Sequence, residues 1–531
     1  MTLDQGERRF QSCKERKGIV IAKVLSSAVI GIEAYLIEVE VDIVRGLPNC
    51  TIVGLPETAV KESKERIKAA VNNSGYNFPD DRITINLAPA NIKKQGTGFD
   101  LPMAIGVLAA SGVLPRKMLQ QLLFLGELSL DGRVKSVCGS LSMALAAKNA
   151  GYKGIVVPDE NKKEAAVVKD IDVYGSDNLS QIVEFVRGNM DIPATDSDIE
   201  SAFTSAEPPE HDFADVVGQE HAKRALEIAA AGGHNLLMIG PPGAGKTMLA
   251  RCMPSILPPL TFEESIETTK VYSVVGMLPK RQALINERQF RAPHHTISDA
   301  GLIGGGVYPR PGEVSLAHNG VLFLDELPEY KKHVLEVMRQ PLEDRHVTIS
   351  RANSSITYPA AFMLIAAMNP CPCGYHSDPK HNCRCAPGEI RRYHSKISGP
   401  LLDRMDLHIE VPAVSYQDLV EIPKSESSRA ICLRVTKARQ SQVRRLGTGR
   451  RIYCNAQMGS REVKKLCELD AESKSLLRAA VDRFGLSARA CYRILKIART
   501  IADLVEEDKI NTDHISEAIQ YRTLDRHELS Y

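Results

Sequence analysis

Short apolar runs alternate with longer amphipathic stretches over residues 18–188. Four runs have the apolar and β-branched content of strands: Ile19–Val24, Tyr35–Val44, Ile83–Leu87 and Ile155–Val157. Three other stretches have the apolar spacing of helices: Thr58–Asn72, Met103–Ala110 and Leu141–Asn149. This alternation predicts an N-terminal α/β domain.

The pattern changes again further along the chain. A polar stretch rich in Asp, Ser, Glu and Pro predicts a linker at 189–212, and the α/β alternation resumes over 213–412. Residues 413–531 have a mostly helical pattern, and residues 1–17 form a charged tail. We therefore expect two α/β domains followed by a helical region.

Composition narrows the class of protein. The chain has 531 residues, enough for several domains, and its 67 Lys and Arg nearly balance its 65 Asp and Glu. Any nucleic-acid contact must therefore come from local basic patches. The longest apolar stretch, around Ile105–Leu114, is too short to cross a bilayer, so we expect a cytoplasmic protein without a membrane partner. In that compartment the twelve cysteines should be reduced thiols or metal ligands.

One loop carries a phosphate-binding motif. Residues Gly240–Thr247 read GPPGAGKT and fit the pattern G-x-x-x-x-G-K-[ST], after the strand-like run Leu236–Ile239. Backbone N–H groups in such a loop face phosphates, so the expected ATP-binding residues are Gly240, Pro241, Pro242, Gly243, Ala244, Gly245, Lys246 and Thr247. Lys246 should reach the β- and γ-phosphates, and Thr247 should hold Mg²⁺.

A second motif, VLFLDE, ends in Asp325 and Glu326. Its four apolar residues are typical of a strand buried on both faces of a parallel sheet. Asp325 is the expected second Mg²⁺ ligand, and Glu326 is expected to orient and polarise the attacking water. The alternative is that the two carboxylates only cap the next helix, but the phosphate loop upstream favours ATP hydrolysis.

Two C-x-C pairs lie within one short segment. The four cysteines are Cys371, Cys373, Cys383 and Cys385. They predict a tetrahedral structural Zn²⁺ site, although C-x-C is tighter than the usual spacing. The segment between the pairs lacks the apolar side chains of a core, so a metal would supply its stability. His376 and His381 are alternative ligands, and reduced thiols or a redox pair are alternatives to a metal site.

These motifs resemble the AAA+ module of the magnesium-chelatase type, and nearly all of residues 18–524 resembles the YifB/ComM group of bacterial Mg-chelatase-like ATPases. The further motifs are DVVGQ at Asp215–Gln219 (adenine contact), RAPHHT at Arg291–Thr296 with Gly304–Gly306, AAMNP at Ala366–Pro370, LLDRMD at Leu401–Asp406 and SAR at Ser487–Arg489. The resemblance implies an AAA+ P-loop α/β/α domain over 213–412, with the cysteine cluster at 371–385 inside it, and a C-terminal helical lid over 413–531.

The resemblance also implies three catalytic roles. Asn369 lies in the first-sensor motif, with an amide suited to hold the lytic water; Arg404 lies in the arginine-finger segment, and Arg489 opens the second-sensor helix. A finger supplied across a subunit boundary implies a homo-oligomeric ring, expected to be a hexamer. The alternatives are a simple ion pair for Arg404, which lies between two aspartates, and an ordinary surface position for Arg489.

Three segments are candidates for DNA contact. Residues 285–319 contain several basic side chains and a triple glycine, and in related ring motors such an insertion points into the central channel. Residues 347–358 predict a hairpin with Arg351 near its tip, and residues 429–451 are basic without an acidic residue. An ordinary hairpin and a solvated helix face are the alternatives.

Residues 83–161 resemble the Lon proteolytic fold through the segments Lys94–Asp100 and Gly151–Asn161. Gly98 falls where Lon-type peptidases have their nucleophilic serine, and Leu141 falls at or near their lysine. A Ser-Lys mechanism needs both groups. We therefore expect a catalytically inactive, Lon-protease-like domain over 18–188.

The likeness to the ComM group implies an ATP-driven motor with a helicase-like or branch-migration role on branched or single-stranded DNA, in recombination of incoming DNA. Two other interpretations come from different classes of protein. One is an AAA+ ATPase that remodels a protein client, as a chelatase motor does. The other is an ATP-dependent protease, which the missing nucleophile disfavours.

Overall fold

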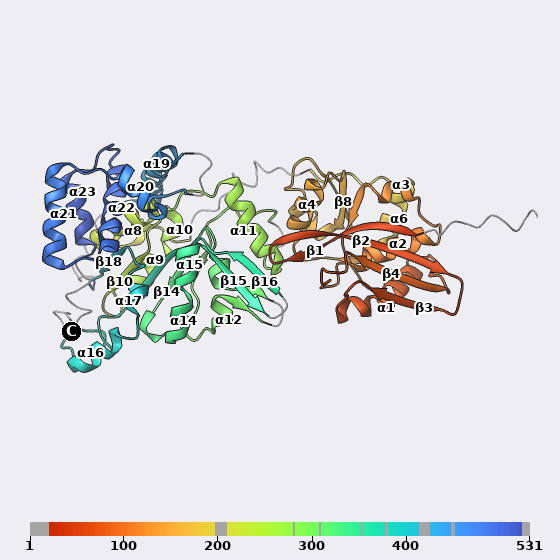
Figure 1. The fold of residues 1–531 in the computed structure, drawn as a ribbon, viewed down its shortest axis with the longest axis horizontal. Coiled ribbons are helices and arrows are strands. Elements are labelled where there is room, and N and C mark those ends of the chain that lie inside the picture. The colour runs from red at the N-terminus through yellow and green to blue at the C-terminus, as the bar shows by residue number, and fades with distance from the viewer. Residues whose placement is uncertain are drawn as a thin grey trace, which may run out of the picture. The chain divides into compact units, whose positions relative to one another are not determined.

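The computed structural model describes residues 21–196, 210–279, 282–306, 309–351, 354–376, 381–413, 425–447 and 452–522 (Figure 1). These residues fall into two compact units. The first unit comprises 21–196 together with 269–279 and 282–285, and the second unit comprises the rest. The predicted tail at 1–17 lies outside the described residues, as does much of the predicted linker at 189–212.

The first unit contains a seven-stranded mixed sheet in the order β3-β4-β2-β1-β5-β8-β9. Its strands are β1 (Ala22–Ile30), β2 (Glu33–Val44), β3 (Asn49–Val53), β4 (Arg82–Ala88), β5 (Leu122–Phe124), β8 (Gly154–Pro158) and β9 (Asp172–Ser176), with a small hairpin of β6 (Glu127–Leu128) and β7 (Val134–Lys135). β2 pairs antiparallel with β1 and β4, and the other neighbours in the large sheet are parallel. Buried residues alternate along β4, as the pleat of a strand with one core face requires.

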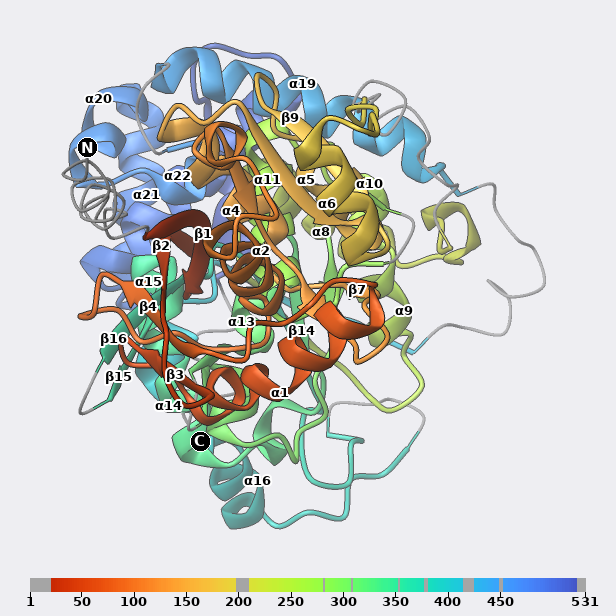
Figure 2. The ribbon, with the colours of Figure 1, turned by 90° about the vertical axis from the view of Figure 1, so that its right-hand side faces the viewer.

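Helices of the first unit pack on this sheet (Figure 2). They are α1 (Thr58–Asn73), α2 (Asp100–Ala110), α3 (Arg116–Leu119), α4 (Ser140–Asn149), α5 (Lys162–Ala165) and α6 (Leu179–Arg187). α2 packs against α1, β1 and β2, and it is buried from Asp100 to Ala109. The unit is therefore α/β, as the apolar pattern predicts, with β3, β5 and β9 as short strands that the pattern did not reveal.

A buried ion pair joins the first two helices. Asp100 is fully buried, and its carboxylate accepts hydrogen bonds from Arg66 Nε at 2.8 Å, from the Ser63 hydroxyl and from the Leu128 N–H. Ser63 and Arg66 lie on one face of α1 because they are three residues apart. The network therefore fixes α1 against the start of α2.

Residues 269–285 belong to the first unit although they follow the phosphate loop in sequence. The end of helix α11 (Phe262–Val274) lies in this segment. Its Ser273 hydroxyl donates to the buried Glu164 carboxylate and accepts from the Gly139 N–H at 3.0 Å. Glu164 also accepts from the N–H of the fully buried Leu141 at 3.0 Å. The segment thus packs beside Leu141, the residue predicted to fall at or near the position of the Lon lysine.

The second unit is built on a five-stranded parallel sheet in the order β11-β14-β17-β10-β18. The strands are β10 (Leu236–Ile239), β11 (Phe290–Arg291), β14 (Val321–Leu324), β17 (Met363–Met368) and β18 (Leu407–Glu410). Every residue of β10, β14 and β17 is buried, as in a parallel sheet covered on both faces. Two hairpins lie outside this sheet: β12 (Gly304–Gly305) with β13 (Arg310–Pro311), and β15 (His346–Arg351) with β16 (Ser354–Pro359).

Helices surround this sheet and follow it along the chain as far as Gln520 (Figure 1). They are α8 (Glu220–Gly232), α9 (Lys246–Arg251), α10 (Met253–Ile256), α12 (Asp299–Leu302), α13 (Glu313–Leu316), α14 (Lys332–Val337), α15 (Arg339–Asp344), α16 (Pro387–His394), α17 (Gly399–Leu402), α19 (Ser428–Leu446), α20 (Ser460–Leu466), α21 (Ala471–Phe484), α22 (Ala488–Leu504) and α23 (Thr512–Gln520). α8, α19 and α22 pack on one another, and one apolar core runs from the sheet into these helices. In the described ranges, no helix is long and apolar enough to cross a membrane.

The Asp100 network gives a test of the first unit. We expect Asp100→Asn to destabilise this unit by about 3 kcal/mol, since removing one partner of a buried ion pair leaves the other uncompensated. Thermal unfolding of the full chain, with hydrogen exchange followed in α1 and α2, measures the effect. Asp170→Asn is the matched control, because its pair with Lys148 at 2.9 Å is solvent-exposed. Equal, small changes in both variants would contradict the role of the network.

Candidate functional site

The phosphate-loop motif forms a strand, loop and helix in the expected order. β10 ends at Ile239 and α9 begins at Lys246. Gly243 and Gly245 have φ of 76° and 83°, a backbone conformation that side chains disfavour. Gly240 is required for a different reason: a Cβ there would lie 2.1 Å from the Val411 carbonyl oxygen. The loop is thus shaped by its glycines against the end of β18.

Lys246 lies at the centre of this loop and is mostly buried. Its ammonium donates to the carbonyls of Gly240 at 2.7 Å and Pro241 at 2.9 Å, and to Asn369 Oδ1 at 3.1 Å. Burial lowers the pKa of Lys246, and the charge of Asp325 opposes this shift. The structure thereby brings together Lys246 and Asn369, the residue predicted to act as the first sensor.

Thr247 and Asp325 also lie together. The Thr247 hydroxyl donates to Asp325 Oδ2 at 2.7 Å, across 78 residues of sequence. A hydroxyl and a carboxylate at the end of a phosphate loop are oxygen ligands of the kind that Mg²⁺ takes beside substrate phosphates. The donor set therefore fits Mg²⁺.

Glu326 is oriented by its backbone and by a histidine. It has φ 51° and ψ 46°, and its N–H donates to Asp325 Oδ1 at 2.9 Å. Its carboxylate lies 3.2 Å from His295 Nδ1, which comes from the segment after β11. Sequence reasoning placed His295 in the insertion but did not connect it to Glu326.

Gln219 supports the loop from the adenine-contact motif. It adopts the left-handed conformation, with φ 58°, and its side-chain amide donates to the carbonyls of Ala244 at 2.5 Å and Pro412 at 3.3 Å. The motif Asp215–Gln219 thus contacts the phosphate loop directly, a contact that the sequence alone did not reveal.

The two predicted arginines occupy different surroundings. Arg404 follows α17, and its guanidinium is paired with Glu343 and the Pro400 carbonyl of the same chain. Arg489 is exposed in the first turn of α22. Within the part of the chain that the structure describes, neither side chain hydrogen-bonds to Gly240–Thr247. Arg404 is thus in an ion pair within the single chain, but its partner is Glu343 and not one of the two aspartates that flank it in sequence.

A third arginine, which sequence analysis did not single out, joins α22 to the sheet. Arg493 Nε lies 3.3 Å from Asp406 Oδ1, and His234 Nδ1 lies 3.3 Å from Asp406 Oδ2. Burial acts to raise the pKa of Asp406, but the hydrogen bond and charge of His234 and the charge of Arg493 lower it to about 2. The only sequence signal was the spacing of four residues between Arg489 and Arg493, which places both on one helix face.

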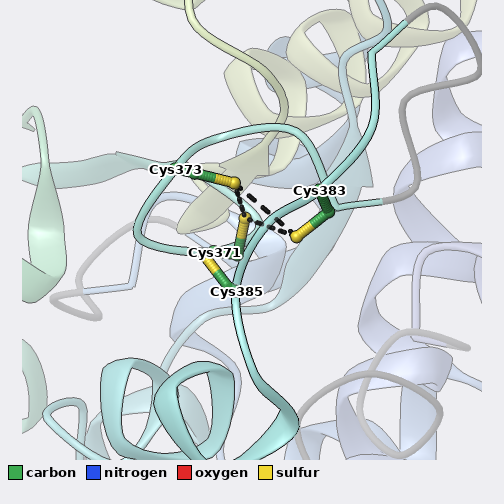
Figure 3. Close-up of side chains that lie close together, drawn as sticks. All are labelled: Cys371, Cys373, Cys383 and Cys385. Atoms are coloured by element: carbon green, nitrogen blue, oxygen red, sulfur yellow. Dashed lines mark hydrogen bonds between the residues drawn. The ribbon is translucent and has the colours of Figure 1, made fainter.

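The four cysteines of the C-x-C pairs converge (Figure 3). Three sulfur–sulfur distances are 3.3 Å for Cys371–Cys373, 3.7 Å for Cys371–Cys383 and 3.6 Å for Cys373–Cys383, and all four sulfurs lie within 4.8 Å of one another. Tetrahedral Zn–S bonds of about 2.3 Å place sulfurs about 3.8 Å apart. The geometry therefore fits one thiolate-bound Zn²⁺ without a histidine ligand.

The surroundings of the cluster favour the thiolate form of one cysteine and the thiol form of another. Backbone N–H groups of Tyr375 and Arg384 lower the pKa of Cys373 to about 6, whereas burial raises the pKa of Cys385 to about 12. A divalent cation stabilises the thiolate form of all its cysteine ligands. The four converging sulfurs are thus compatible with a bound metal.

Comparisons with protein families cover most of the chain. The profile of the family described as magnesium chelatase, subunit ChlI, matches residues 212–419, and the ChlI C-terminal profile matches residues 425–522. A third profile, subunit ChlI of Mg-chelatase, matches residues 39–161. These matches agree with an AAA+ domain, a C-terminal helical lid and a separate N-terminal domain.

Three similar proteins define the relationship further. Competence protein ComM of Haemophilus influenzae is 44% identical over 95% of this chain and 98% of its own length. The YifB protein of Escherichia coli is 44% identical over 95% of this chain and 97% of its own. Lon protease 2 of Bacillus subtilis is 35% identical over 154 residues, 26% of each chain, which supports the Lon-like similarity. The chain therefore belongs to the YifB/ComM family of Mg-chelatase-like AAA+ ATPases.

Proposed function

We propose that this protein is an ATP-hydrolysing ring motor that acts on DNA. The observation that carries the ATPase part is the meeting of Lys246, Thr247, Asp325 and Asn369 at one end of the parallel sheet. The phosphate loop binds ATP, Thr247 and Asp325 hold Mg²⁺, and Glu326 activates the water that Asn369 helps to position. The Mg²⁺ ion, when bound, neutralises charge on the phosphates.

Assembly completes the site in this proposal. A γ-phosphate under attack needs an additional positive charge, which a neighbouring subunit supplies as Arg404. In the single chain Arg404 is paired with Glu343, so it must exchange that carboxylate for the partner's nucleotide. Arg489, exposed on α22, then couples the state of the bound nucleotide to the position of the helical lid. We propose a hexameric ring, in keeping with this shared pocket.

DNA contact is supported by the two hairpins and by a relative's name. Arg351 and Arg310 are exposed on hairpin strands β15 and β13. The relative named competence protein ComM supports a role on DNA, which we propose to be branch migration or a helicase-like action on branched or single-stranded DNA. Arg288 and Arg291, in contrast, are paired with Glu264 and Glu313, so these two guanidinium groups are already engaged.

The basic segment 429–451 is a weaker candidate for DNA contact than its composition indicates. Arg434 is paired with Glu227 and Glu426, and Arg445 is paired with Asp503. Arg439 donates to the carbonyls of Ala230 and Ala231, and Arg450 lies outside the described residues. Most of these cations hold α19 in place, and Arg444 is an exposed exception.

The first unit does not act as a peptidase in this proposal. Gly98 lies where the serine would be, and a Cβ there would touch Val137 Cγ1 at 3.4 Å. Leu141 is fully buried beside Glu164. Neither a nucleophile nor a lysine is present at the two positions, so the unit serves assembly or binding. We also propose that the cysteine cluster holds a structural Zn²⁺, which requires the reducing conditions of the cytoplasm.

Shared pockets can be tested by mixing two inactive variants. We expect Arg404→Ala and Glu326→Gln each to lower ATP turnover by about 10²-fold or more, because one lacks the finger and the other lacks the base. A mixture of the two regains turnover above their sum, because an Arg404→Ala pocket then receives the arginine of a Glu326→Gln neighbour. Steady-state turnover in purified protein measures this. Full ATP turnover by an Arg404→Ala protein that remains monomeric would contradict the proposed ring.

DNA action is tested by stimulation of ATP turnover. Forked or four-way DNA should raise turnover several-fold, and the stimulation should fall steeply with salt because phosphate contacts dominate such binding. Arg351→Ala should lower the stimulation and reduce the salt dependence, with DNA-independent turnover retained. Arg444→Ala, which removes an exposed arginine from the basic segment 429–451, is the control for the loss of one positive charge. Normal basal turnover without any DNA stimulation would favour a protein client instead.

A further inference from the structure

The cysteine cluster is joined to the phosphate loop through one short segment. The segment runs from Met368, the last residue of β17, to Gly374, within the cluster. Cys371 and Cys373 lie in it, and Cys371 is fully buried. The cysteines and the nucleotide site are therefore separated by only a few residues of the chain.

Three contacts connect this segment to the loop. The Gly240 N–H donates to the Met368 carbonyl at 3.2 Å, and Lys246 donates to Asn369 at 3.1 Å. The third contact is apolar: Gly374 packs so closely on Pro242 that a Cβ would lie 2.6 Å from Pro242 Cδ. The beginning, middle and end of the phosphate loop thus each touch the segment.

Gly374 owes its position to the cluster. It has φ 86°, and its N–H donates to the Cys371 carbonyl at 2.9 Å, which closes a tight turn around the first two thiols. The His376 N–H donates to Cys371 Sγ at 3.3 Å. These are local hydrogen bonds within a small polar loop that has no apolar core of its own. The turn therefore needs a further link to Cys383 and Cys385 to become ordered.

We propose that the four cysteines bind one Zn²⁺ that braces the phosphate loop, so that nucleotide affinity depends on the metal. The ion ties the segment 368–374 to the strand of chain at Cys383 and Cys385, and the ordered turn then holds Pro242 and Asn369 in place. This inference rests on the nucleotide site of the proposed function but not on DNA action or hydrolysis. It assigns the cluster a role in pre-organising the loop, since a loop that is already ordered loses less entropy on binding ATP.

The brace is tested with a matched pair of substitutions at one ligand. Cys383→Ser removes a zinc ligand, whereas Cys383→His replaces it with another. Metal content by elemental analysis, affinity for a non-hydrolysed ATP analogue, and hydrogen exchange of residues 240–247 without nucleotide are measured on the full chain. None of these measurements depends on DNA or on turnover.

We expect about one zinc per chain in the unmodified protein and in Cys383→His. Cys383→Ser should lose the metal, bind the ATP analogue about tenfold more weakly, and exchange faster in the phosphate loop. Cys138→Ser, at an exposed cysteine of the first unit, should match the unmodified protein. Exchange in β14 and α22, in the same unit as the cluster but away from residues 240–247, serves as the measure of intact folding.

Chelation and return of zinc gives a second test that needs no substitution. Loss and recovery of affinity with the metal would support the brace even if Cys383→Ser folds poorly. Unmodified protein without bound metal would overturn the proposal. So would metal loss with unchanged affinity and unchanged exchange in residues 240–247, because the cluster would then be peripheral to the loop.

Discussion

The register of the parallel sheet in the second unit is the constraint on which the nucleotide site depends. Ile239 pairs with Met368 on one side and with Glu410 on the other, and Leu324 pairs with Ala366. The residues that follow these strands therefore emerge at one edge, where Lys246, Asn369 and Asp325 meet. The strands are buried on both faces, so apolar burial fixes the register.

The sheet also determines how the C-terminal helices are attached. Asp406 immediately precedes β18 and lies between His234, which precedes β10, and Arg493 of α22. Arg489 lies one turn before Arg493 on the same helix. These contacts attach α22 to the sheet at the opposite end of the strands from the phosphate loop.

Local patterns in the sequence predict about half of the strands and the phosphate loop, because burial and glycine chemistry act on neighbouring residues. The pattern VLFL predicts β14, and the GPPGAGKT segment predicts the turn before α9. Pairings between distant residues were not predictable. Two ion pairs, Arg404–Glu343 and Arg445–Asp503, join elements about 60 residues apart in sequence. A charge pattern along one helix does not reveal such partners. The cysteine spacing was informative because it predicted that the four sulfurs converge, as the structure shows.

Several polar groups of the proposed nucleotide site are bonded to one another or to backbone carbonyls. Lys246 bonds to two carbonyls and to Asn369, Thr247 bonds to Asp325, and Arg404 is paired with Glu343. A buried ammonium without a partner would be costly, so these bonds stabilise Lys246 within the phosphate loop. The same bonds order the loop, and a loop that is already ordered loses less entropy when it binds a ligand.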